Sequence, residues 1–85
     1  MNAGYLYDIF VTTEKTKATD LYTGLAVLQQ TNPVRDPAEL REIREFLGRH
    51  YDVLTKAYQT GNKADFAVAV AQCEVEDAAA QKEEN

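Results

Sequence analysis

The sequence predicts an all-α protein, a small antiparallel bundle of three helices over about residues 3–30, 37–60 and 63–81. Three observations predict it. Apolar residues recur at spacings of three and four over long stretches, turn residues separate these stretches at two places, and 85 residues leave room for one domain. We therefore expect residues 1–85 to form a single helical domain, with residues 82–85 as a frayed acidic tail.

Residues 3–30 form the first predicted helix, although their beginning allows two interpretations. Residues 5–11 are rich in aromatic and β-branched side chains, which is typical of a strand. Over a longer window, apolar residues from Leu6 to Leu28 fall on one helical face, and neither Gly nor Pro interrupts the intervening polar stretch. We therefore predict one helix, bent near residues 13–16, and a strand at residues 5–11 is the alternative.

Residues 37–60 carry the clearest helix signal in the chain. Asp36 is a favourable N-cap, and Pro37 suits the first helical position. Gly61 suits the left-handed turn that follows the last residue of the helix. Apolar residues then follow at helical spacing, and we expect this stripe to face the core: Leu40, Ile43, Leu47, Tyr51, Leu54 and Tyr58. The proline-framed connection before it, residues 31–35, is predicted to be a tight, ordered loop.

Residues 63–81 form the third predicted helix, with Asn62 as its N-cap. Phe66, Val70 and Cys73 form its buried stripe. Small residues are expected to widen that stripe: Ala67, Val68, Ala71, Val75, Ala78 and Ala79. Because alanine side chains are short, this helix is suited to close approach by another backbone.

The net charge of −5 is concentrated at the C-terminus. Residues 1–73 hold nine acids against eight Lys or Arg, whereas residues 74–85 hold five acids against Lys82. No basic stripe is present, so we expect no direct contact with nucleic acid. Neither a signal peptide nor a membrane span is recognisable, so we expect a cytoplasmic protein without a membrane partner.

The residues that most often carry chemistry have no supporting pattern. His50, the single histidine, has Phe46 and Leu54 one turn away on either side, so no metal ligand or carboxylate partner accompanies it locally. Cys73, the single cysteine, excludes an intramolecular disulfide and is predicted to be a buried, inert thiol. The sequence therefore predicts no enzyme, no cofactor and no metal site.

The chain has more large apolar residues than the core of a small three-helix bundle needs. On the first predicted helix some point away from the main stripe, and on the second some flank it. Exposed apolar patches usually mark a partner surface or a dimer seam, although wide buried faces are the alternative explanation. We therefore select six candidate partner contacts: Tyr5, Ile9, Val27, Phe46, Val53 and Tyr58.

These patterns predict a small non-enzymatic protein–protein interaction module, an adaptor, co-chaperone or inhibitor, that binds another protein through an exposed apolar helical face. A homodimer is compatible with the same face. The alternative, drawn from the acidic C-terminus, is a nucleic-acid mimic that blocks a DNA- or RNA-binding protein. A strand-led dimer that reads DNA with residues 5–11 is a third hypothesis, weakened because Asp8 is the only charge in that segment.

Overall fold

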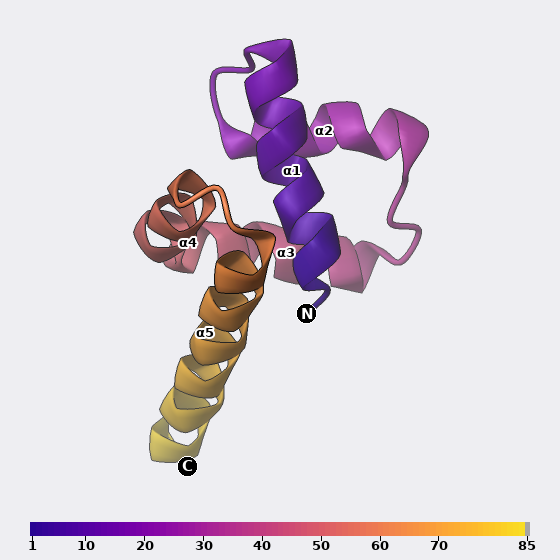
Figure 1. The fold of residues 1–85 in the computed structure, drawn as a ribbon. Coiled ribbons are helices and arrows are strands. Elements are labelled where there is room, and N and C mark those ends of the chain that lie inside the picture. The colour runs from indigo at the N-terminus through magenta and orange to yellow at the C-terminus, as the bar shows by residue number, and fades with distance from the viewer. Residues whose placement is uncertain (85) are drawn as a thin grey trace.

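The computed structural model describes the backbone of residues 1–84 and the side chains of residues 1–81. Over this range the chain forms five helices and no strand: α1 (Ala3–Thr16), α2 (Leu21–Thr31), α3 (Pro37–Arg49), α4 (Tyr51–Gln59) and α5 (Lys63–Glu84) (Figure 1). The all-α prediction is confirmed, and the strand at residues 5–11 is wrong because these residues lie within α1. The predicted count of three helices is also wrong.

The first predicted helix, residues 3–30, is divided into α1 and α2. Lys17 ends α1 in the left-handed region, with φ 54° and ψ 37°, and its N–H donates to carbonyl oxygens of the last turn. Asp20 then begins α2, because its carboxylate accepts the N–H of Thr23 at 2.8 Å. A side-chain cap therefore starts a new helix where neither Gly nor Pro marks a break.

The second predicted helix, residues 37–60, is divided into α3 and α4. The predicted N-cap is confirmed, since the Asp36 carboxylate accepts the N–H of Ala38 at 3.0 Å. His50 leaves helical geometry, with φ −116° and ψ 22°, and α4 runs in a different direction from α3 (Figure 1). The break changes which face is buried. Tyr51, predicted for the core, is 52 % exposed, whereas Phe46, predicted to flank it, is 1 % exposed.

The third predicted helix is a single helix, α5. Asn62 accepts the N–H of Ala64 at 2.8 Å, as expected of its N-cap, and Gly61 has a positive φ of 74°. The backbone of α5 continues to Glu84, beyond the predicted end at residue 81. The tail predicted at residues 82–85 includes Asn85, which lies outside the described residues. Neither α5 nor any other described helix is both long and apolar enough to cross a membrane.

The buried core draws side chains from all five helices. α1 is central to it, since it packs against α2 and also against α5. Four aromatic rings join α1 to α4 and α5, with centroids 5.1–5.4 Å apart: Tyr7, Phe10, Tyr58 and Phe66. Because α1 is covered on more than one side, Ile9 is fully buried, and the expectation that it points away from the core is wrong.

Candidate functional site

The second half of α5 extends beyond the other helices. Figure 1 shows its last turns, in yellow, running away from α1–α4 towards the C-terminus. Among the described side chains of α5, residues 63–81, those that are buried are Phe66, Ala69, Val70 and Cys73, all in its first half. A groove of about 560 Å³ opens where α3 faces this part of α5, with Arg49 and Gln81 among its lining residues. The helix is therefore anchored at its beginning and projects at its end.

An exposed row of small apolar residues runs along α5 on the side opposite to its buried face. We call Val68, Ala71, Val75 and Ala78 the α5 stripe. Their spacings of three, four and three place them on one helical face, and all four are exposed. The side chain of Val68 is 57 % exposed and that of Val75 is 69 % exposed. The prediction that these residues widen the buried stripe is therefore wrong.

The second half of α5, whose side chains are described to residue 81, is the segment that projects. It is acidic, but two of its carboxylates are paired within the chain. Glu74 accepts the N-terminal amine of Met1 at 3.1 Å. Asp77 accepts Arg49 Nη2 at 2.9 Å, and its other oxygen lies 2.9 Å from His50 Nε2. These contacts tie the middle of α5 to α3 and to the start of the chain.

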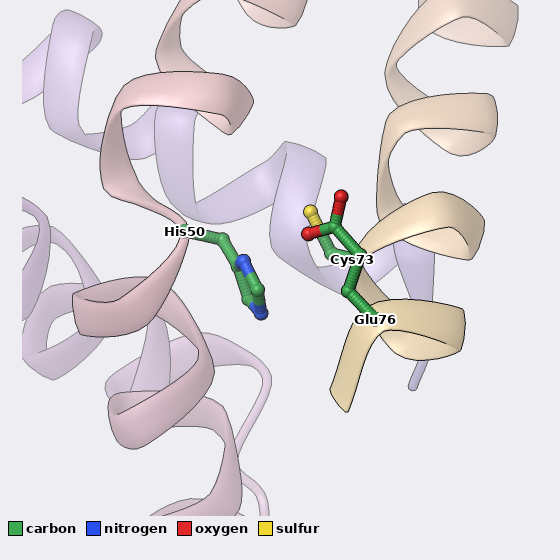
Figure 2. Close-up of side chains that lie close together, drawn as sticks. All are labelled: His50, Cys73 and Glu76. Carbon is green, nitrogen blue, oxygen red and sulfur yellow. The ribbon is translucent and has the colours of Figure 1, made fainter. Parts of the chain in front are cut away.

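A second feature lies where α3 and α4 meet, and we call it the junction cluster: His50, Cys73, Glu76 and Asp77. One nitrogen of His50, the Cys73 sulfur and one carboxylate oxygen of Glu76 all lie within 4.8 Å of one another. Figure 2 shows the His50 ring facing the sulfur and the carboxylate across the space that separates it from α5. Histidine, cysteine and carboxylate side chains are the usual protein ligands of zinc.

The surroundings of the junction cluster shift the pKa values of two of its members. Burial raises the pKa of the Cys73 thiol, and the carboxylates of Glu76 and Asp77 raise it further, so the free thiol stays protonated and unreactive. Partial burial alone would raise the pKa of Asp77, but hydrogen bonds from Arg49 and His50 outweigh it and lower that pKa overall. Asp77 is therefore a carboxylate that holds the imidazole in place.

His50 illustrates what sequence reasoning missed. A local search finds Phe46 and Leu54 one turn away, whereas its carboxylate partner Asp77 lies 27 residues further along the chain. The spacing of potential ligand residues along α5 was a sequence signal for this cluster. Glu76 and Asp77 lie three and four residues after Cys73, so all three side chains lie towards one face of the helix. The pairing of that face with His50 depends on the break between α3 and α4.

Two of the six predicted contact residues are part of the core. Ile9 is 0 % exposed and Phe46 is 1 % exposed, so neither side chain lies on the surface of the folded chain. Phe46 also packs against the His50 ring, with centroids 4.8 Å apart. Both residues therefore stabilise the fold, and we do not retain them as partner contacts.

The other predicted contacts are dispersed. Val53 is 48 % exposed on α4, and Val27 is half-buried on α2. Tyr5 and Tyr58 are half-buried, and each hydroxyl has a partner within the chain. The Tyr5 hydroxyl donates to the Asn32 carbonyl at 2.8 Å, and that of Tyr58 donates to Glu14 at 3.2 Å. These residues lie on three different helices and are not part of the α5 stripe.

No protein-family model, curated protein sequence or solved structure matches the chain. Two features of the described chain remain as candidate sites. The α5 stripe is an exposed apolar surface, and the junction cluster gathers side chains of the kinds that bind metal ions.

Proposed function

We propose that the chain is a non-enzymatic interaction module that binds a partner protein through the α5 stripe. The observation that carries the proposal is a row of exposed Val and Ala residues on a helix that projects from the rest of the fold. Adaptors, co-chaperones and inhibitors all use such a surface. We place the chain in a reducing cytoplasm, which suits a buried cysteine without a disulfide partner.

The small side chains of the stripe favour a helix as the partner element. Short residues let two helix axes come within about 8 Å, which increases van der Waals contact along the whole seam. The two valines supply most of the apolar area, and both are more than half exposed in the isolated chain. A partner helix with apolar residues at heptad spacing therefore fits this face.

The charges around the stripe indicate the flanks of that partner. Residues 63–81 of α5 hold one lysine against four acids. This surface stays net negative although Glu74 and Asp77 are paired within the chain. A partner helix with Lys or Arg beside its apolar residues would therefore meet a complementary charge, which increases the association rate and the specificity. We therefore expect a basic, amphipathic partner helix, and a second copy of this acidic chain is a poorer fit.

The nucleic-acid mimic is the alternative function. A mimic needs a row of free carboxylates, whereas Glu74 and Asp77 bind Met1, Arg49 and His50 within the chain. The two functions differ in their response to salt. Binding by a mimic weakens steeply as salt rises, whereas binding through an apolar seam with a charged rim weakens only modestly.

Affinity capture with matched variants of the full chain tests the proposal. Val68→Glu combined with Val75→Glu introduces two charges into the stripe, and Gln72→Glu combined with Gln81→Glu introduces the same charge on α5 outside it. Circular dichroism checks that both variants remain helical. We expect one partner to be captured by the wild type and by the control variant, in low and high salt, and to be lost with the stripe variant.

Two results would contradict the proposal. A partner that the stripe variant still captures does not bind through Val68 and Val75. A partner that both variants retain in low salt but release in high salt favours the acidic mimic. Light scattering on the wild type and on the stripe variant adds the remaining test. If the wild type is a dimer and the stripe variant is a folded monomer, the stripe serves self-association.

A further inference from the structure

We propose that the junction cluster binds a divalent transition-metal ion, with Zn²⁺ as the best match, through His50, Cys73 and Glu76. This site is independent of the proposed partner surface. The ligand atoms of the three side chains lie within 4.8 Å of one another, although the residues come from two separate elements. Nitrogen, sulfur and carboxylate oxygen together form a ligand set that selects zinc and related ions over Mg²⁺ or Ca²⁺.

The separations in the cluster are close to those that a metal requires. Zinc holds sulfur at about 2.3 Å and nitrogen or oxygen at about 2.0–2.2 Å, so tetrahedral ligand atoms lie about 3.3–3.7 Å apart. From separations of up to 4.8 Å, the ligands need to close by up to about 1.1–1.5 Å. Glu76 is exposed and able to make this movement by changing its side-chain rotamer, whereas Cys73 is buried and fixed.

His50 is oriented for metal binding by a partner outside the ligand set. Its Nε2 lies 2.9 Å from Asp77 Oδ1, which leaves Nδ1 as the nitrogen available to an ion. Metal-binding histidines commonly donate their second ring nitrogen to a carboxylate, which fixes the tautomer and increases the basicity of the ligand. Asp77 is itself held by Arg49 Nη2 at 2.9 Å, so the imidazole, carboxylate and guanidinium form one connected network.

Three protein ligands leave a fourth tetrahedral position for water or for a group from another molecule. On binding, the Cys73 thiol loses its proton to the solvent, and a sulfur–metal bond replaces the S–H bond. The ion would link the junction of α3 and α4 directly to α5. It would therefore fix the part of α5 from which the helix projects, since its two α5 ligands, Cys73 and Glu76, stand on either side of Val75 in the sequence.

Titration of the reduced full-length chain with Co²⁺ tests the site, because a cobalt–thiolate bond produces a charge-transfer absorption band in the near ultraviolet. We expect this band to appear at one equivalent and to disappear on addition of Zn²⁺. Cys73→Ala is expected to abolish it. Glu76→Gln is expected to weaken binding by about tenfold or more, whereas Glu74→Gln, the same change two residues away, leaves the affinity within about twofold.

Asp77 is a positioning residue in this site, and its variant separates positioning from ligation. Asp77→Asn is expected to weaken Co²⁺ binding by about tenfold or more and to retain the charge-transfer band at saturation, because the sulfur remains a ligand. Circular dichroism verifies the fold of each variant. Absence of a thiolate band in the folded wild type would overturn the proposal. Equal losses of affinity in Glu76→Gln and Glu74→Gln would also overturn it, since they indicate only nonspecific attraction to acids.

Discussion

Gly24 of α2 lies against Thr13 of α1 so closely that no side chain fits between the two helices. A Cβ built on Gly24 would overlap the Thr13 hydroxyl and lie 3.1 Å from the Thr13 Cα. The hydroxyl is held in this position because it donates to the Ile9 carbonyl at 2.7 Å. The absence of a side chain at position 24 therefore sets the distance between α1 and α2, the pair that covers much of the core.

Gly24→Ala is expected to lower the free energy of unfolding by about 2–3 kcal/mol, because the added methyl group forces α1 and α2 apart. Urea denaturation followed by circular dichroism measures the change. Gly4→Ala is the matched control. A Cβ at Gly4 would lie 3.3 Å from a single side-chain oxygen of Asn2, so alanine there is tolerated far better. Equal stability of the Gly24 variant and the wild type would show that the two helices are not in fixed contact.

Lys17→Gly is expected to stabilise the chain by about 0.5–1 kcal/mol. Lys17 has φ 54°, a left-handed conformation that glycine adopts without steric cost. Lys15→Gly is the control, because Lys15 lies within α1 and glycine there is expected to cost about 1 kcal/mol. Chemical denaturation of both variants measures the difference. If both glycines destabilise the protein, α1 does not end at Lys17.

Asp20 makes the stability of α2 depend on pH. Hydrogen bonds from the backbone and side chain of Thr23 lower its pKa below the ordinary value of 3.8. A lowered folded-state pKa means that the charged cap stabilises the fold above pH 3.8 and that this contribution is lost as the pH falls through the folded-state value. The thermal midpoint of the wild type should therefore exceed that of Asp20→Asn at pH 7, and the two should converge in acid. A difference that grows in acid would contradict this origin.

Tyr5 connects α1 to the end of α2. Its hydroxyl donates to the Asn32 carbonyl at 2.8 Å and accepts from Gln29 Nε2 at 2.6 Å. Tyr5→Phe removes both bonds and is expected to lower the free energy of unfolding by about 1–2 kcal/mol. Tyr51→Phe is the matched control, since that ring is 52 % exposed, and its stability should equal that of the wild type. Equal effects in the two variants would show that the hydroxyl of Tyr5 contributes nothing specific.

The fold class and the two proline- or glycine-marked connections could be predicted from the sequence, because caps and helical periodicity are local properties. The two additional breaks could not. At Lys17 and at His50 the chain leaves helical geometry without Gly or Pro, so the residues that most often end a helix do not mark these breaks. The start of α2 at Asp20 was a readable signal, since aspartate is one of the preferred N-cap residues.

The candidate site was predicted less well than the fold, and burial is the reason. Periodicity shows which residues share a face, but it does not show whether that face meets another helix. Ile9 is therefore buried by α1 packing on several sides, whereas Val75 remains exposed because nothing in the described chain covers that side of α5. The His50–Asp77 pair joins residues 27 positions apart, which no local pattern indicates.

The most direct test of the proposed function places a photo-crosslinking amino acid at Val75 of the full chain, in cells that naturally produce it. A second version carries the same amino acid at Lys56, an exposed position on α4. We predict one heavier adduct with a partner protein from position 75 and none from position 56. Adducts of equal yield from both positions, or none from position 75, would contradict the claim that the α5 stripe is the partner surface.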